Sequence, residues 1–103
     1  MTNSFADFKN AKMILVIGSN MTEAHPVAAT FVKDAVLSGA QLIVVDPRRT
    51  DLVDFASLHV PINVGSDVAF INGVMNVLIN ENLYDKAYVE SCTTGFDELK
   101  QKV

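Results

Sequence analysis

Two short, largely apolar runs, each followed at once by a polar turn, constrain the fold of this chain more than any other feature. The runs are Met13–Ile17 and Gln41–Val45. Their apolar residues are continuous, which is typical of strands in a parallel sheet that is covered on both faces. Between them, apolar residues recur at helical spacing over residues 26–38, with a proline in the first turn and Gly39 placed to end the helix. The pattern predicts a β-α-β unit.

The rest of the chain continues the alternation of strands and helices. Ser66 is suited to cap a helix, and Asp67 in its first turn would complement the helix dipole. The expected elements are a short helix (51–56), a brief strand (around 58–62), a long helix that ends near 80–82, and two short helices (84–90 and 96–103). The order predicts a single α/β domain over residues 1–103 with a helical C-terminal tail.

Composition excludes several classes of protein. The chain has 103 residues, half of them apolar, which suffices for one modest core. A net charge of −4 argues against a nucleic-acid-binding surface. No apolar run approaches the length of a membrane span and no secretion signal is visible, so we expect a cytoplasmic location. One cysteine forms neither an internal disulfide nor a multi-cysteine metal site.

Polar residues follow both predicted strands at the point where each strand ends. Because parallel strands end at the same edge of a sheet, we expect the turn at residues 18–23 to meet the turn at 46–49. In the first turn, Gly18 allows a close approach of the backbone, and polar side chains such as Ser19 and Asn20 can donate hydrogen bonds to a phosphate. The glycines do not form the G-x-G-x-x-G fingerprint of dinucleotide sites, and strand-to-helix turns favour the same residue types without any ligand.

Two carboxylates extend this candidate site. Asp46 ends the second strand, where a carboxylate commonly accepts both hydroxyls of a ribose, and Arg48 or Arg49 can neutralise a diphosphate. The alternative for Asp46 is a simple Asp-Pro turn. Asp67 can accept hydrogen bonds from the N1–H and amino groups of guanine, and its alternative is stabilisation of the helix N-terminus.

Several of these segments, taken together, resemble one known family. ILVIGSNMTEAHP, LIVVDPRRT, VGSD, NENLYDKAYVE and TGFDEL occur in order over nearly the whole chain. They are similar to the guanine dinucleotide-binding domain of molybdopterin oxidoreductases, specifically of the formate dehydrogenase alpha subunit. The resemblance implies a three-layer, Rossmann-like α/β fold with a short parallel sheet flanked by helices.

The resemblance also assigns cofactor contacts by position. The implied contacts with the phosphate and guanosine end of molybdopterin guanine dinucleotide fall in three segments: Gly18, Ser19, Asn20, Met21 and Glu23; Val45, Asp46, Pro47 and Arg48; and Gly65, Ser66 and Asp67. No residue of this chain is assigned to catalysis or to a metal. His25 is interpreted as a helix N-terminal residue, His59 as structural, and Cys92 as a small apolar residue.

The family's remaining features would lie outside these residues. In the parent enzyme that the resemblance implies, two pterin guanine dinucleotides hold molybdenum or tungsten, formate is oxidised to carbon dioxide, and electrons leave through a 4Fe-4S cluster to a partner subunit or acceptor. The cluster's cysteines and the cysteine or selenocysteine that binds the metal are absent here. We therefore expect an excised piece of a longer chain, inactive alone and in contact with the parent's remaining domains.

Other functions remain open on the sequence. The same turns suit a self-contained module for another purine nucleotide, the central domain of a thiamine-diphosphate enzyme, or the equivalent domain of another molybdopterin oxidoreductase such as a nitrate reductase. The residues that decide the substrate, the metal and the electron acceptor are not among those present.

Overall fold

The computed structural model describes residues 3–103 and divides the chain into two compact units. We call residues 3–64 the sheet unit and Gly65–Val103 the helical unit. The elements of the sheet unit are the 3₁₀ helix η1 (Phe5–Asn10), strand β1 (Met13–Ile17), helices α1 (Met21–Ala24) and α2 (Pro26–Leu37), strand β2 (Gln41–Val45), the 3₁₀ helix η2 (Asp51–Phe55) and strand β3 (Leu58–Val60). The helical unit contains α3 (Asp67–Asn80), α4 (Lys86–Cys92) and α5 (Phe96–Lys102).

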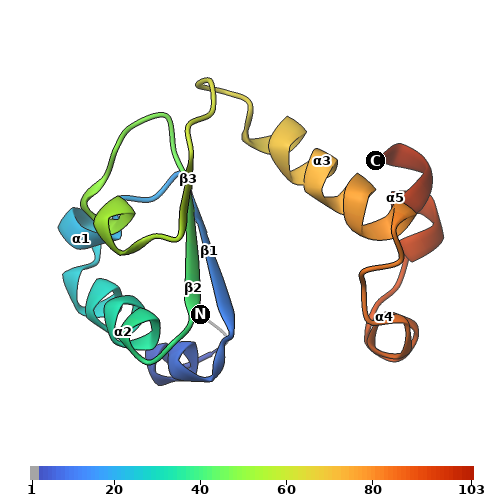
Figure 1. The fold of residues 1–103 in the computed structure, drawn as a ribbon. Helices are drawn as coiled ribbons and strands as arrows, with labels where there is room; N and C mark the ends of the chain where they lie inside the picture. The colour runs from blue at the N-terminus through green and yellow to red at the C-terminus, as the bar shows by residue number, and fades with distance from the viewer. Residues whose placement is uncertain (1–2) are drawn as a thin grey trace. The chain divides into compact units, whose positions relative to one another are not determined.

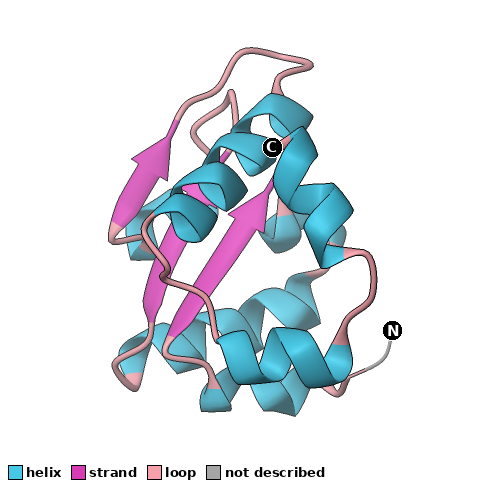
Figure 2. Ribbon diagram, turned by 90° about the vertical axis from the view of Figure 1, so that its right-hand side faces the viewer, coloured by secondary structure: helices cyan, strands magenta, loops and turns pink. Residues whose placement is uncertain are grey.

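The sheet unit is built on three parallel strands in the order β1-β2-β3 (Figure 2). Ile14 pairs with Leu42, and Val44 pairs with His59. Helix α2 connects β1 to β2 and runs beside the sheet (Figure 1). The predicted α/β class is confirmed, as are both main strands and the crossover helix. The third strand is shorter than expected.

The core of the sheet unit lies between one face of the sheet and two helical elements of the same unit, α2 and η2. Alternate residues of a strand point to the same face, so every second residue of β1 is buried. The buried core cluster consists of Ile14, Val16, Val32, Ala35, Leu42, Val44, Leu52 and Val53. The apolar runs predicted strands covered on both faces, whereas elements of the sheet unit cover one face, and Met13 and Leu15 on the other face are exposed.

Two short elements of the sheet unit were not predicted. η1 begins after Ser4, whose side-chain oxygen accepts the N–H of Ala6 at 3.2 Å. The Phe5 ring lies 6.1 Å from the Phe31 ring of α2, which ties η1 to the crossover helix. α1 occupies residues expected to form an open turn. Both elements are too short for helical periodicity to reveal them in a sequence.

The helical unit follows the predicted order with shifted boundaries. Ser66 stands at the N-cap of α3 as expected, but its side chain makes no capping hydrogen bond. Helix α4 begins two residues later than predicted, because the Asp85 carboxylate caps it by accepting the N–H of Tyr88 at 3.0 Å. The rings of Tyr84 and Phe96 are 5.1 Å apart and join α5 to the segment before α4. Among residues 3–103, no helix is long and apolar enough to cross a membrane.

Candidate functional site at the carboxyl edge of the sheet

The ends of β1 and β2 are tied together by the backbone of Gly18. Gly18 has a φ of +58°, in the left-handed region that residues other than glycine rarely adopt. Its N–H donates to the carbonyl oxygen of Val45 at 2.9 Å. The first turn therefore starts directly beside the end of β2, so the expected meeting of the two turns at one edge is confirmed.

The first turn then continues into α1 rather than into the crossover helix. α1 spans only four residues, and its last turn closes when the N–H of His25 donates to the carbonyl of Met21 at 2.9 Å. Pro26 then begins α2. A phosphate in this turn would therefore meet a single helical turn rather than the N-terminus of α2, and polar side chains must supply more of its hydrogen bonds than the sequence suggested.

Two side chains of this segment hold polar atoms without partners. Oδ1 of Asn20 and Oγ1 of Thr22 are buried and make no hydrogen bond in the described structure. Buried polar atoms are usually paired, because an unpaired one costs about 1–3 kcal/mol. Such atoms are common where a protein binds something else, and Asn20 is one of the predicted contacts.

The second turn, residues 46–48, is closed by its own aspartate; we call it the Asp46 turn. Asp46 is 2% exposed. Its Oδ1 accepts the backbone N–H of Arg48 at 2.8 Å, and Nε of Arg48 lies 3.6 Å from the same oxygen. The backbone N–H of Asp46 donates to the carbonyl of Val60 at 3.2 Å. The carboxylate thus performs the turn-forming role that the sequence offered as its alternative.

The two arginines of this region lie in different surroundings. Arg48 has a side chain that is 73% exposed, and its contact with Asp46 is long for an ion pair. Arg49 instead pairs with Asp54 of η2 at 2.7 Å. Of the two, Arg48 retains the greater freedom to reach a diphosphate, as its assignment requires.

Thr50 is a buried polar residue at this edge that sequence reasoning missed. It is 6% exposed, precedes η2, and its Oγ1 has no partner in the described structure. η2 packs against α1, so Thr50 belongs to the same part of the sheet unit as Thr22. A threonine before a short helix is typical of a cap, so no sequence pattern singles it out.

The third predicted segment belongs to the helical unit. Gly65 has a φ of +86°, and Asp67 is the first residue of α3. The structure brings together the segments at 18–23 and 45–48 in the sheet unit, and it describes Gly65, Ser66 and Asp67 with the other unit. Their assignment remains a prediction.

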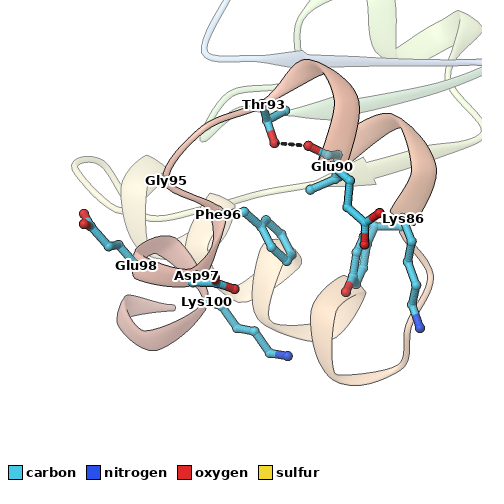
Figure 3. A pocket seen from close by; sticks show the side chains of 10 residues that line it. Lys86, Glu90, Thr93, Gly95, Phe96, Asp97, Glu98 and Lys100 are labelled. Atoms are coloured by element: carbon cyan, nitrogen blue, oxygen red, sulfur yellow. Dashed lines mark hydrogen bonds between the residues drawn. The ribbon is translucent and has the colours of Figure 1, made fainter.

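The helical unit also carries an open pocket of about 610 Å³ between α4 and α5. Figure 3 shows the Phe96 ring facing into it, with Glu98 pointing away from the ring and Lys100 extending beneath the ring toward the side of Lys86. The charged side chains that line it are exposed. Among residues 3–103, no three histidine, cysteine, aspartate or glutamate side chains are grouped to hold a metal ion.

Comparison with known proteins assigns the chain to a family. The sequence model of "Molybdopterin oxidoreductase" matches residues 1–101. The chain belongs to the molybdopterin oxidoreductase family. It is 45% identical over 101 residues to the F420-dependent formate dehydrogenase subunit alpha of Methanocaldococcus jannaschii, covering 98% of this chain and 15% of that protein. It is 36% identical to the assimilatory nitrate reductase catalytic subunit of Bacillus subtilis, covering 98% of this chain and 14% of that one.

A solved structure with a similar sequence confirms the fold. The acetylene hydratase from Pelobacter acetylenicus matches with a TM-score of 0.82 and 42% identity, over 96% of this chain and 13% of that one. This member of the molybdopterin oxidoreductase family thus spans about one seventh of the length of the relatives it matches.

Membership of the family implies a molybdopterin cofactor, and the residues at the sheet edge fit the polar groups of one. Gly18 places a left-handed turn at the end of β1, and its N–H joins that turn to the end of β2. Within the described residues, Asn20, Thr22 and Thr50 carry polar atoms without partners, and Arg48 supplies a positive charge at the surface. Hydroxyl, amide and guanidinium groups suit phosphate and ribose oxygens.

Proposed function

We propose that this chain is the molybdopterin guanine dinucleotide-binding domain of a formate dehydrogenase catalytic subunit. Its three contact segments, at 18–23, 45–48 and 65–67, would hold the guanosine diphosphate end of the cofactor. Support comes from the family match over residues 1–101 and from the formate dehydrogenase relative that is 45% identical.

One observation carries the proposal: the hydrogen bond from the Gly18 N–H to the Val45 carbonyl at 2.9 Å. It joins two segments assigned to the same ligand although they are more than twenty residues apart in sequence. Ligands of open parallel sheets bind outside the carboxyl ends of the strands, which is where this bond lies.

We propose that the Asp46 turn opens when a ribose binds. The Asp46 carboxylate is buried, and its Oδ1 already accepts the Arg48 N–H. We propose that the diphosphate attracts the exposed Arg48 side chain away from Asp46, since the guanidinium matches phosphate geometry better than it matches a single carboxylate oxygen at 3.6 Å. The carboxylate would then exchange the backbone N–H for ribose hydroxyls.

In the parent enzyme, the bound cofactor would supply the molybdenum or tungsten centre at which formate is oxidised to carbon dioxide. This chain would contribute binding and orientation, and it would contact the remaining domains of the catalytic subunit. A 4Fe-4S cluster elsewhere in the parent would pass electrons to a partner subunit or acceptor. We expect the chain alone to reduce no dye with formate and to bind no metal.

The nitrate reductase relative favours a second candidate, the same domain in an enzyme with another substrate. Relatives named for formate, nitrate and acetylene share this segment at 36–45% identity. Because proteins named for such different substrates keep the same segment, we infer that it serves cofactor binding in all of them. The rest of the parent chain would distinguish the candidates.

The proposal is tested by replacing Asp46 with asparagine and titrating the chain with guanosine diphosphate by calorimetry. Asp46→Asn keeps an oxygen that can accept the Arg48 N–H, so the turn and the fold should persist. Loss of the charged acceptor should lower the affinity about tenfold or more, because hydrogen bonds to charged groups contribute roughly 1.5–3 kcal/mol.

Asp54→Asn is the matched control. It removes the same charge from an exposed carboxylate that pairs with Arg49 on the surface of the sheet unit. We expect its affinity to stay within about twofold of the wild type, because exposed ion pairs contribute little. Equal affinities for the wild type and Asp46→Asn would remove Asp46 from the site.

A further inference from the structure

We propose that His59 is a positioning residue that holds the backbone of Asp46 in place for ligand binding. The inference deepens the proposed function and rests on it for the identity of the ligand. Sequence patterns support only a structural interpretation of His59, because it lies thirteen residues from Asp46 and outside every motif.

The geometry starts from the pairing of β3 with β2. His59 is the middle residue of β3 and pairs with Val44, so both side chains project from the same face of the sheet. The ring is half-buried, and its Nε2 lies 3.2 Å from the carbonyl oxygen of Asp46. The side chain of an edge strand thereby reaches the backbone at the end of the neighbouring strand.

The chemistry of this contact fixes where the ring carries its proton. A carbonyl oxygen accepts hydrogen bonds and cannot donate them. Nε2 of His59 must therefore be the donor, either in the neutral ring with its proton on Nε2 or in the doubly protonated ring.

Asp46 is held by hydrogen bonds from two directions. Its N–H donates to the Val60 carbonyl at 3.2 Å, and its carbonyl accepts from His59, so two adjacent residues of β3 hold its backbone. The third bond, from the Arg48 N–H to Oδ1, belongs to the turn itself. This third bond is the one that a ribose would replace.

Because the bonds from β3 are separate from the bond that closes the turn, His59 has a specific role. When the Arg48 side of the turn opens, the bonds from β3 would keep the Asp46 backbone at the sheet edge, so that its carboxylate meets the ligand without a search over conformations. Preorganised groups bind more tightly because less freedom is lost on binding. Without the His59 bond, the Asp46 carbonyl would lose its hydrogen bond to β3. The Asp46 backbone would then leave its place at the sheet edge more often in the free chain, and the Arg48 N–H bond that depends on it would break with it.

Two substitutions separate positioning from a general contribution to packing. His59→Gln keeps an N–H donor at the end of a side chain of similar reach, and His59→Leu keeps bulk without any donor. Both are placed in the full 103-residue chain. The first measurement, made without ligand, is the hydrogen-exchange rate of the Arg48 and Val44 amides by NMR.

We expect His59→Leu to raise the exchange rate of the Arg48 amide roughly two- to tenfold, which corresponds to the loss of one ordinary hydrogen bond. The Val44 amide in the centre of the sheet should be unchanged, and His59→Gln should restore the wild-type rate at Arg48. If both variants behave alike, or if the Arg48 and Val44 amides accelerate together, the positioning role is wrong.

The second measurement is calorimetric titration of the same variants with guanosine diphosphate. His59→Leu should weaken binding by about the same factor, and His59→Gln should rescue it. Full affinity in His59→Leu would overturn the inference. If the wild type itself fails to bind guanosine diphosphate, the proposed function fails, while the exchange rates at Arg48 still decide whether His59 positions the turn.

Discussion

The sheet unit and the helical unit bury their apolar residues to very different extents. Leu42, Val44, Val32 and Leu52 of the sheet unit are fully buried, whereas Ile79 is the single buried apolar residue that the described part of the helical unit contains. Several large apolar residues of α3 are exposed, among them Val68, Ile71 and Val77. The comparison indicates that the packing energy of the described chain is concentrated in the sheet unit.

The two units also differ in how they hold polar groups. Asp46 and Thr50 of the sheet unit are buried, and Asp46 is fixed by hydrogen bonds. The pocket of the helical unit is hollow and lined by charges, but those charges are exposed to water. The presence of a pocket alone is therefore weak evidence for a binding site in this chain. Buried polar groups that are held by hydrogen bonds or lack partners identify the more specific candidate site.

The largest expected effect tests the difference in packing directly. Leu42→Ala removes a fully buried side chain from the sheet, and it should lower the free energy of unfolding by about 2–5 kcal/mol. Leu83→Ala makes the same change at a residue of the helical unit that is 61% exposed, and it should alter stability by less than about 0.5 kcal/mol. Urea denaturation measures both. Similar losses of stability in the two variants would show that the two units do not differ in packing energy.

The next largest effect is expected from a substitution at Asp67, which tests whether the helical unit contributes to ligand specificity. If Asp67 recognises guanine, Asp67→Ala should lower the affinity for guanosine diphosphate roughly tenfold or more, because hydrogen bonds to a charged group contribute about 1.5–3 kcal/mol. Adenosine diphosphate lacks the N1–H and the 2-amino group, so its binding should hardly change. Calorimetric titration with both nucleotides gives the discrimination.

The alternative role of Asp67 predicts a different outcome. As the first residue of α3, its carboxylate complements the helix dipole, worth about 0.3–1 kcal/mol of stability. A small loss of stability with unchanged preference for guanine would confine the binding role to the sheet unit.

The smallest expected effects are those of replacing one glycine in each unit with alanine. Gly18→Ala places a side chain at a φ of +58° and should destabilise the chain by about 1–2 kcal/mol. Gly73 lies inside α3 with open space where a Cβ atom would stand, so Gly73→Ala should stabilise the chain by about 0.5–1 kcal/mol. Thermal unfolding of both variants shows whether Gly18→Ala lowers the stability and Gly73→Ala raises it. Destabilisation by Gly73→Ala would show that the α3 surface is covered in solution.

The sequence predicted the elements with strong patterns and missed those that depend on contacts. Continuous apolar runs revealed β1 and β2, and helical spacing revealed α2 and α3. The four-residue α1 and the 3₁₀ helix η1 are too short for a periodic signal, and α1 begins without a side-chain cap. The shift of α4 arises from Asp85, whose capping role competes with a helix start at Tyr84.

The candidate site also has features that the sequence predicted and features that depend on contacts in the folded chain. Strand-end position was enough to predict that Gly18 and Asp46 lie at one edge, because parallel strands end together. The burial of Asp46 and the contact of His59 in β3 with the end of β2 depend on strand register, which the sequence leaves open. The Thr50 hydroxyl is buried without a partner only in the folded sheet unit, so no local sequence pattern marks it.

The most direct test is an NMR titration of the chain with guanosine diphosphate, followed through its backbone amides. We predict that the largest shifts fall on Gly18, Asn20 and Arg48, at the carboxyl edge of the sheet, with a further shift at Asp67. Adenosine diphosphate should shift the same edge but leave Asp67 unchanged. Shifts confined to the α4–α5 pocket around Phe96, or none at saturating nucleotide, would contradict the account.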